Sequence, residues 1–423
     1  MLTKAPRGTN DIFYPKSNLW QYLETKMRSV CSRFGYSEIM TPTFEHTELF
    51  LRGVGDTTDV VEKQMYTFTD KGDRSITLRP EGTASVARAF IERNMYANPL
   101  PVKQFYIIPC FRYEKPQAGR LREFHQFGVE VFGSQNPTID AEIISLVHML
   151  LSEIGLKSVT LNINSIGCPT CRKAYNEKLI AYFKEHYDTL CDTCKSRLER
   201  NPLRILDCKS PICGELAKDA PKLIDHICEE CSTHFEGVKT RLDALNIPYV
   251  INPDIVRGLD YYTKTVFEFV AEDIGAQSTV CGGGRYDGLV QELGGPETPG
   301  IGFAMGIERL ILTLESQGAN FDVETKPDIY ISSIGDAADV EAEKLVYILR
   351  GAGFYAEKDR VGRSLKAQMK YADKIGAAYT IVLGDDEVTS RSAELKNMQT
   401  GEKTGVQLDA LADALKEINR GEE

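Results

Sequence analysis

Hydrophobic and polar positions along the chain predict an α+β fold followed by a smaller α/β unit. Helices are expected where apolar residues recur at helical spacing, over 18–34, 84–93 and 140–154. Extended segments are expected over 36–44, 247–256 and 265–270. Pro42 favours an edge or interface position for the first of these. Thr83 is expected to cap the helix over 84–93.

A hairpin over 104–133 is the most informative of these elements, because a loop rich in Arg and Gly joins its two extended segments. Side chains alternate along a strand, so Arg112 and Glu114 share one face of the first segment. On the second segment the apolar face carries Phe127, Val129 and Val131. The opposite face carries Gln126, Gly128 and Glu130. We expect the apolar face to pack in a core, and Gly128 to leave room for a small polar ligand above the polar face.

The pattern changes after this hairpin. Glycines at 302 and 306 fit a helix that begins near Phe303 and packs tightly on a sheet, with Arg309 one turn further along. A linker is expected at 318–326. Beyond it, strands are expected at 329–333, 355–358 and 380–383, and helices at 340–350, 365–375 and 408–418. Strands that alternate with helices in this way predict a separate small α/β domain.

Composition indicates a soluble globular protein of two or three domains, with 423 residues, 42% hydrophobic and 26% charged. The N-terminus carries charges and no apolar segment, so we expect no secretory signal, no membrane span and a cytoplasmic location. The net charge of −11 argues against a sequence-blind nucleic-acid coat. It leaves open a specific RNA partner held by local basic groups such as Lys195, Arg197, Arg200 and Arg204, although a solvated face of mixed charge is the commoner fate of such groups.

Eight of the eleven cysteines fall between 168 and 231, in a charged, helix-prone block that reads as an insertion at about 167–240. They form the pairs Cys168/Cys171, Cys191/Cys194, Cys208/Cys213 and Cys228/Cys231. In a cytosolic protein such pairs favour metal over disulfides, and eight thiolates suit two tetrahedral structural zinc sites. The alternative is free thiols in a helical insertion, which is the expected state of Cys31, Cys110 and Cys281.

Several polar groups could bind a ligand. Glu81 could hold an ammonium group, but a carboxylate just before a helix is by itself more simply explained by the helix N-terminus. Arg112 lies amid an apolar run, whereas Arg120 and Arg122 either bind an anion or belong to a solvated loop. Tyr261 and Tyr262, with Arg257, either grip a polar ligand or pack with satisfied hydroxyls. Because the chain has no G-x-x-x-x-G-K-[ST] loop, any ATP would have to be held by arginines on an antiparallel sheet.

A series of motifs then resembles bacterial histidyl-tRNA synthetase, a class II aminoacyl-tRNA synthetase, over essentially the whole chain. The motifs are Arg-Pro-Glu-Gly-Thr (79–83), Phe-Arg-Tyr-Glu (111–114), Gly-Arg-Leu-Arg-Glu-Phe-His-Gln (119–126), Arg-Gly-Leu-Asp-Tyr-Tyr (257–262), Gly-Gly-Arg-Tyr-Asp (283–287) and Gly-Ile-Glu-Arg (306–309). The resemblance implies a class II catalytic domain over 1–322, with an antiparallel sheet and a Cys-rich helical insertion. It also implies an anticodon-binding domain over 326–423 and a homodimer formed through the strand and helix at 34–48.

The resemblance also implies the ligands and their contacts. L-Histidine and ATP with Mg²⁺ would react to histidyl-adenylate, and the histidyl group would pass to the 3′ end of tRNA(His). ATP would be held by Arg112, Arg120 and Arg309. Histidine would be held by Glu81, Gly82, Thr83, Arg112, Gln126, Glu130, Arg257, Tyr261, Tyr262 and Tyr286. Arg112 and Arg257 would be catalytic, because they would neutralise charge where two anions react.

Two rival functions remain at this point. One is a non-catalytic paralogue that regulates ATP phosphoribosyltransferase; such paralogues lose catalytic arginines and the C-terminal domain, and this chain keeps Arg112, Arg257, Arg309 and that domain. The other is a synthetase for a different amino acid, which the segment at 257–262 opposes. In the family the insertion lies against the tRNA acceptor stem. Many members lack these cysteines, so a metal there would be no part of the shared mechanism.

Overall fold

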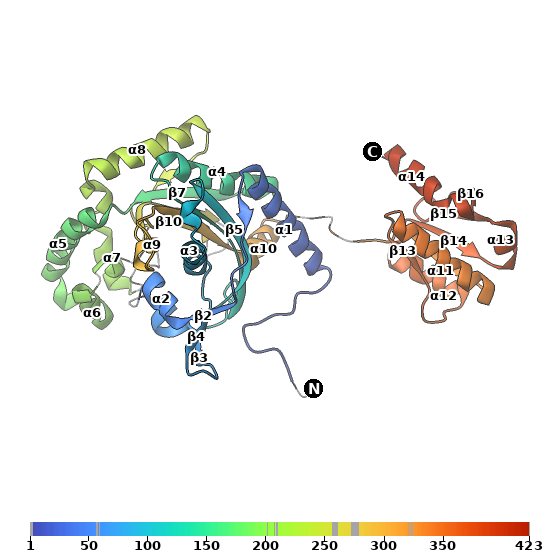
Figure 1. The fold of residues 1–423 in the computed structure, drawn as a ribbon, viewed down its shortest axis with the longest axis horizontal. Helices are drawn as coiled ribbons and strands as arrows, with labels where there is room; N and C mark the ends of the chain where they lie inside the picture. The colour runs from blue at the N-terminus through green and yellow to red at the C-terminus, as the bar shows by residue number, and fades with distance from the viewer. Residues whose placement is uncertain are drawn as a thin grey trace. The chain divides into compact units, whose positions relative to one another are not determined.

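The computed structural model describes residues 3–55, 58, 60–200, 202–206, 208, 210–255, 261–271, 279–319, 321, 323 and 325–422. The chain forms two compact units, residues 1–321 and residues 322–423. Each unit is built around its own main sheet (Figure 1). Within the described ranges, no helix combines the length and apolar character that crossing a bilayer requires.

The first unit is built on an eight-stranded sheet with the order β1-β5-β6-β11-β10-β9-β7-β8. Its strands are β1 Ser37–Glu38, β5 Val102–Phe111, β6 Glu123–Phe132, β7 Val159–Ser165, β8 Val250–Ile251, β9 Thr263–Ala271, β10 Thr279–Arg285 and β11 Gly300–Gly306. The central pairs are antiparallel, and the two-residue strands β1 and β8 pair in parallel at the two edges. The edge position expected for 36–44 is confirmed, although in this range only β1 pairs with the eight-stranded sheet, and Phe44 begins the edge strand of a separate small sheet.

Helices cover both faces of this sheet. They are α1 Lys16–Arg33, α2 Thr47–Val54, α3 Thr83–Glu92, α4 Pro137–Glu153, α9 Leu289–Glu292 and α10 Ile307–Ser316. Helices α1 and α4 pack with the sheet in the largest buried apolar cluster, and α3 and α9 belong to a second cluster on the other face (Figure 1). The three helices expected before residue 160 are therefore confirmed. Helix α4 starts earlier than expected, because the Asn136 side chain accepts a hydrogen bond from the Thr138 N–H and Pro137 occupies the first turn.

A small sheet and a helical insertion complete the first unit. The small sheet has the order β2-β4-β3, with β2 Phe44–His46, β3 Tyr66–Thr69 and β4 Ser75–Leu78. Between β7 and β8 the chain forms α5 Pro169–Glu185, α6 Asp192–Arg200, α7 Pro211–Lys218 and α8 Glu229–Ala244. Helix α8 packs against α4, and the other three gather around a small apolar cluster of their own (Figure 1).

The alternation of β6 is confirmed. Phe127, Val129 and Val131 are buried in the cluster formed with α1 and α4. Gln126 and Glu130 are also buried, on the face that carries α3. The sheet therefore has one apolar face and one face with buried polar groups, which is the arrangement that a ligand site requires.

The expected helix beginning near Phe303 is wrong: residues 300–306 form β11, which pairs with both β6 and β10. The glycines serve close approach inside the sheet. A Cβ on Gly302 would lie 1.9 Å from Oε2 of Glu130 and 2.3 Å from the Val129 carbonyl oxygen. Helix α10 begins only at Ile307, so Arg309 lies in its first turn.

The second unit confirms the expected α/β alternation. Its sheet has the order β13-β12-β14-β15-β16, with β12 Ile329–Ser333, β13 Ala356–Lys358, β14 Tyr379–Leu383, β15 Ser392–Asn397 and β16 Lys403–Gln407. Its helices are α11 Asp336–Gly351, α12 Leu365–Lys374, α13 Asp385–Ser390 and α14 Leu411–Glu422. The first three strands of the sheet order are parallel, and β15 and β16 add an antiparallel hairpin.

Candidate active site

A cavity of about 270 Å³ opens on the polar face of the eight-stranded sheet. Side chains at the start of α3, on β6 and β9 to β11, and in the first turn of α10 line it. Tyrosines and the α3 residues form one group of lining residues, and arginines form another. We call these groups the tyrosine end (Glu81, Thr83, Gln126, Tyr261, Tyr262, Tyr286) and the arginine end (Arg112, Gly119, Arg309).

The tyrosine end begins at the N-terminus of α3. Both oxygens of Glu81 accept backbone hydrogen bonds at 2.8 Å, one from Thr83 and one from Ala84. Glu81, not Thr83, therefore caps the helix, and the expected Thr83 cap is wrong. The Thr83 hydroxyl instead donates to Oε1 of Glu130 at 2.7 Å. Burial raises the pKa of Glu81, and its hydrogen bonds with Ala84 and Thr83 oppose that rise.

Glu130 organises the tyrosine end from beneath. Its side chain is completely buried, and its carboxylate accepts hydrogen bonds from Thr83, from the Tyr106 hydroxyl at 3.2 Å and from the Tyr286 hydroxyl. Burial raises the pKa of Glu130 to about 8, against the lowering effect of these hydrogen bonds. A buried carboxyl with such a pKa is typical of a functional site.

The expectation that Gly128 leaves room for a ligand is wrong, because the ring of Tyr106 fills that space. Tyr106 faces Gly128 across the β5–β6 ladder, and a Cβ on Gly128 would lie 2.2 Å from Cζ of the ring. Gly82 makes room for the same ring from the other side, since a Cβ there would lie 2.3 Å from Cζ. Sequence reasoning missed Tyr106. The alternation 106, 108, 110, 112 could have placed it on the face of Arg112.

The predicted histidine-binding residues that the structure describes lie together. Gln126 accepts a hydrogen bond from the Gly82 N–H at 3.2 Å. Tyr261 contacts Tyr262 and Tyr286, with ring centroids 4.7 and 5.6 Å apart. All three tyrosines are buried. Arg257, predicted to be catalytic, lies outside the described residues.

The arginine end brings together the arginines that the sequence suggested for ATP. Arg112 follows the last residue of β5, and its Nε donates to the Pro80 carbonyl at 2.8 Å. Arg309 Nη1 donates to the Thr279 carbonyl at 2.9 Å. Burial, together with the positive charges of Arg120 and Arg112, lowers the pKa of Arg309. The group therefore repels added positive charge and favours an anion.

A nearby carboxylate neutralises the positive charge of the arginine end only in part. Oxygens of Glu114 lie 3.5 Å from Arg120 Nε and 4.0 Å from Arg112 Nη1. Arg122 is different: its guanidinium stacks on the Tyr113 ring, 4.0 Å from the centroid, and it does not line the cavity. The loop alternative therefore describes Arg122 better than anion binding does.

Two further acids line the cavity and were missed from the sequence. Glu268 on β9 accepts a hydrogen bond from the Thr279 hydroxyl at 3.2 Å. Glu308 accepts from the His125 backbone N–H at 2.9 Å, and one of its oxygens lies 2.9 Å from His125 Nδ1. The alternation of β9 could have placed Glu268 on the polar face, whereas the position of Glu308 depends on where α10 begins.

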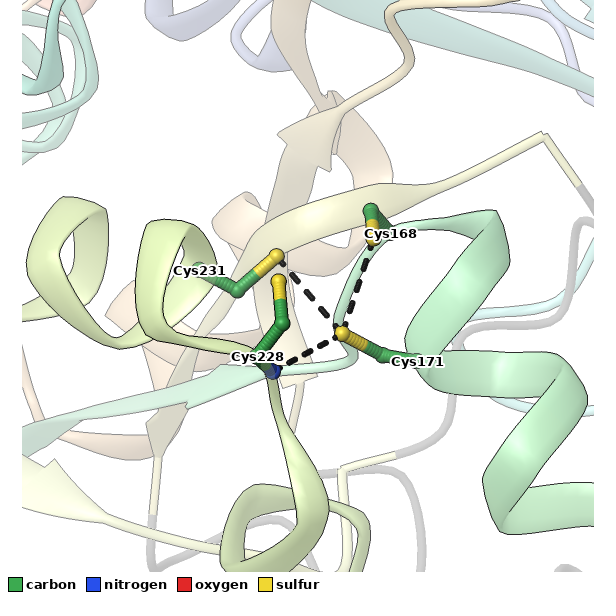
Figure 2. Close-up of side chains that lie close together, drawn as sticks. All are labelled: Cys168, Cys171, Cys228 and Cys231. Carbon is green, nitrogen blue, oxygen red and sulfur yellow. Dashed lines mark hydrogen bonds between the residues drawn. The ribbon is translucent and has the colours of Figure 1, made fainter.

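The eight paired cysteines lie in the insertion and form two groups. Cys168, Cys171, Cys228 and Cys231 form the first (Figure 2), and Cys191, Cys194, Cys208 and Cys213 form the second. Cys31, Cys110 and Cys281 are buried, lie outside both groups and form no disulfide, as expected.

Comparison with known proteins matches the chain to two family models. The model described as histidyl-tRNA synthetase covers residues 8–170 and 213–310, and the one described as anticodon binding domain covers residues 328–418. The histidine–tRNA ligase of Acetivibrio thermocellus is 59% identical over 98% of this chain and 100% of its own length. The enzyme of the same name from Clostridioides difficile is 55% identical over 99% and 100%.

Solved structures agree with these relatives. The apo crystal structure of S. aureus histidyl-tRNA synthetase superposes with a TM-score of 0.85 at 45% identity, over 98% of this chain and 100% of that one. A Bacillus halodurans structure titled as an ATP phosphoribosyltransferase regulatory subunit/histidyl-tRNA synthetase covers 91% of this chain and 99% of its own, with a TM-score of 0.65. At 22% identity it shows a shared fold and nothing more.

Proposed function

Because this chain belongs to the histidyl-tRNA synthetase family and is a histidine–tRNA ligase, we propose that its cavity binds histidine at the tyrosine end and ATP at the arginine end. The family uses ATP and Mg²⁺, and its substrates are histidine and tRNA(His). The regulatory paralogue is excluded, since relatives 55 to 59% identical over nearly the full length are histidine–tRNA ligases.

The convergence of arginines at one end of the cavity carries this proposal. Arg112 and Arg309 line it, and Arg120 is close enough to lower the pKa of Arg309. Guanidinium groups suit phosphate oxygens, because their fixed fork of donors matches the oxygen geometry. We assign Arg112 to the α-phosphate, Arg309 to the γ-phosphate and Arg120 to the nucleotide.

Mg²⁺ fits the same end of the cavity. It takes oxygen ligands and usually binds through one or two carboxylates together with substrate phosphates. The Glu268 carboxylate lines the cavity that Arg309 also lines, so it would hold the ion on the ATP phosphates. The ion would neutralise phosphate charge as the pyrophosphate leaves.

The tyrosine end offers complementary groups to histidine. Glu81 and Thr83, beside Gly82, would hold the α-amino group, and Gln126 would lie near the carboxylate. Glu81, whose two oxygens already accept backbone hydrogen bonds at the start of α3, offers its carboxylate where a cationic amine would enter. Gln126 is already oriented by the Gly82 N–H, which restricts the directions in which its amide can point.

The imidazole would lie between Glu130 and Tyr262, assisted by Tyr261 and Tyr286. Glu130 already accepts hydroxyl hydrogen bonds at this end, so an imidazole N–H would be a further donor to the same carboxylate. A pocket that pairs both imidazole nitrogens rejects other side chains, because they leave buried polar groups unpaired. Such pairing can discriminate by roughly four orders of magnitude without editing.

The chemistry follows from charge. The histidine carboxylate attacks the α-phosphorus of ATP, the bond to the bridging oxygen breaks, and pyrophosphate leaves. Both reactants are anions, so Arg112, and Arg257 outside the described residues, would offset their repulsion and the charge of the transition state. No general base is needed for a carboxylate that is already ionised. The terminal ribose hydroxyl of tRNA(His) then attacks the adenylate carbonyl and AMP leaves.

The domains and the dimer complete the proposal. We assign catalysis to the first unit and the anticodon arm to the second, whose residues match the anticodon-binding model. The segment after β1 exposes Met40 and Phe44, at 81% and 56% of their full areas. Large apolar side chains left in water beside a sheet edge favour burial against a second copy, which supports a homodimer through residues 34–48.

Histidine-dependent ATP–pyrophosphate exchange tests the assignment of the cavity. Purified protein should catalyse exchange with histidine and not with other amino acids. Substitution in the tyrosine end should raise the KM for histidine, and substitution in the arginine end should raise the KM for ATP. A substitution at the tyrosine end that raised only the KM for ATP would reject the proposed orientation.

A further inference from the structure

The cysteine pairs of the insertion are brought together in a nested order that their spacing does not reveal. The first pair, Cys168/Cys171, meets the last pair, Cys228/Cys231, while the two middle pairs meet each other. The first group therefore joins the two ends of the insertion, and the second group lies within it. Each group contains four sulfurs from two separate segments, all within 4.8 Å of one another.

The sulfur separations match those around a single tetrahedral metal ion. In the first group, Cys171 Sγ lies 3.5 Å from Cys168 Sγ and 3.9 Å from Cys231 Sγ. In the second group, Cys191 Sγ lies 3.8 Å from Cys208 Sγ. A tetrahedral ion with metal–sulfur bonds of about 2.3 Å holds its sulfurs about 3.8 Å apart. A disulfide would need about 2.05 Å, and none of the eleven cysteines, all of which the structure describes, forms one.

Helix starts surround the first group (Figure 2). Cys168 precedes the first residue of α5 and Cys228 precedes the first residue of α8, so Cys171 and Cys231 lie in the first turns of these helices. The Cys228 N–H donates to Cys171 Sγ at 3.0 Å. Helix N-termini and N–H donors both stabilise thiolates, the form in which cysteine binds a metal.

The second group repeats this arrangement inside the small apolar cluster of the insertion. Cys191 precedes α6, and its N–H donates to the sulfur of Cys213 at 3.3 Å, in the first turn of α7. Cys194 and Cys213 are completely buried and belong to that cluster. A segment of this size has little apolar surface to bury, so it commonly depends on a metal or another covalent staple.

We propose that the insertion binds two structural Zn²⁺ ions, one at Cys168, Cys171, Cys228 and Cys231, the other at Cys191, Cys194, Cys208 and Cys213. Four closely spaced thiolates with no open position are the donor set of a structural zinc site. An iron–sulfur cluster takes its thiolates on several iron atoms, so it would hold the sulfurs further apart. Neither ion takes part in the reaction.

The first ion would anchor the base of the insertion beside the cavity, a role that the second ion lacks. Just before Cys168, the chain pairs with the strand that follows the histidine-binding tyrosines. The Ile166 N–H donates to the Lys264 carbonyl at 2.8 Å, and the Lys264 N–H donates to the Gly167 carbonyl at 2.9 Å. Lys264 is separated from Tyr262 by one residue. The first site therefore anchors the base of the insertion beside the tyrosine end, and this consequence rests on the proposed function of that end.

Zinc content of the full-length protein tests the proposal without any variant. Protein produced in zinc-supplemented medium and purified without chelator should contain about two zinc ions per chain by plasma mass spectrometry, one for each cysteine group. A mercurial that titrates the thiols should release both. Protein loaded with Co²⁺ should show the intense visible absorption of tetrahedral cobalt thiolates. Zinc near zero, near one ion per chain, or not released by the mercurial would overturn the proposal.

Paired variants assign the ions to the two groups. C168S/C171S and C191S/C194S should each lose one ion, whereas C31A, at a buried cysteine outside both groups, should keep two. Loss of the first ion should raise the KM for histidine about tenfold and leave the KM for ATP nearly unchanged, because the tyrosine end shifts. Loss of the second should leave both KM values unchanged. If either double variant retained two ions, the assignment of the ions to the two cysteine groups would be wrong, whatever KM values it showed.

Discussion

Tyr106 and Gly128 are partners across the β5–β6 ladder, and the tyrosine ring occupies the space where a side chain at 128 would lie. The Tyr106 hydroxyl reaches Oε1 of Glu130, two residues further along β6, at 3.2 Å. A glycine thus admits a buried ring, and the ring orients a buried carboxylate. The relationship links the packing of the sheet to the proposed histidine site.

Gly128→Ala should damage this site through packing. The added Cβ would lie 2.2 Å from the Tyr106 ring, so the ring must move and release Glu130. We expect a loss of about 1–3 kcal/mol in the free energy of unfolding, typical of overpacking, and a higher KM for histidine. Gly405→Ala is the matched control, because it lies on β16 with no atom within 4 Å of the added Cβ. Equal effects of the two substitutions would contradict this account.

Tyr106→Phe distinguishes the effect of the hydroxyl's hydrogen bond from the effect of the ring's packing. The ring still fills the space above Gly128, and Glu130 loses one hydrogen bond. We expect histidine-dependent exchange to fall about five- to tenfold, equivalent to roughly 1 kcal/mol for one buried hydrogen bond. The KM for ATP should not change. A larger loss than that of Gly128→Ala would show that the hydroxyl matters more than the packing.

Glu130→Ala should severely reduce histidine activation while ATP binding remains largely intact. The substitution removes the carboxylate proposed to accept the imidazole N–H, and the arginine end is left in place. Histidine-dependent exchange and ATP binding by calorimetry measure the two halves separately. Glu394→Ala, at an exposed glutamate of the second unit paired with Lys403, serves as the control. Near-normal exchange in Glu130→Ala would contradict the assignment of Glu130 to the imidazole of histidine.

The pKa of Glu130 gives a pH dependence with a definite sign. Its folded-state pKa of about 8 exceeds the value of an unfolded glutamate, about 4.3, so the folded state binds the extra proton between these values. Stability from this group is therefore present at low pH and falls as the pH rises from about 5 to 8, by up to about 1.4 kcal/mol per pH unit. Glu130→Gln removes the titration.

Thermal unfolding of wild type and Glu130→Gln from pH 5 to 9 measures this effect. The melting temperature of the variant should rise relative to wild type up to about pH 8, and the difference should then level off. A difference that does not change with pH would mean that Glu130 stays ionised in the folded protein.

Arg309→Ala should weaken ATP use selectively. Removing the half-buried guanidinium proposed to bind the γ-phosphate should lower exchange about 10²- to 10³-fold and raise the KM for ATP, with a much smaller effect on the KM for histidine. Arg33→Ala, at a half-exposed arginine paired with Glu153 on the opposite face of the sheet, should leave exchange unchanged. A change confined to the KM for histidine would place Arg309 in the wrong half of the cavity.

Much of this site was predictable from local pattern. The alternation of β6 correctly separated Phe127 and Val129 from Gln126 and Glu130, because strand geometry alone places neighbours on opposite faces. The expectation of a helix beginning near Phe303 was wrong because the local pattern there was ambiguous. The segment 300–306 carries glycine or alanine at every second position, a pattern of small residues that fits a tightly packed helix as well as a strand, and its strand pairing comes from β6 and β10, which are distant in the sequence.

The amino-acid sequence by itself determined the α+β class, the polar face of the hairpin, the family and the arginines suited to ATP. These depend on residue type, order and local periodicity. Only the tertiary structure decided that Tyr106 fills the space above Gly128, that Glu81 caps α3, and that the first cysteine pair meets the last. Such contacts join residues far apart in the chain, and their distances are set by strand register and helix packing, which no local pattern records.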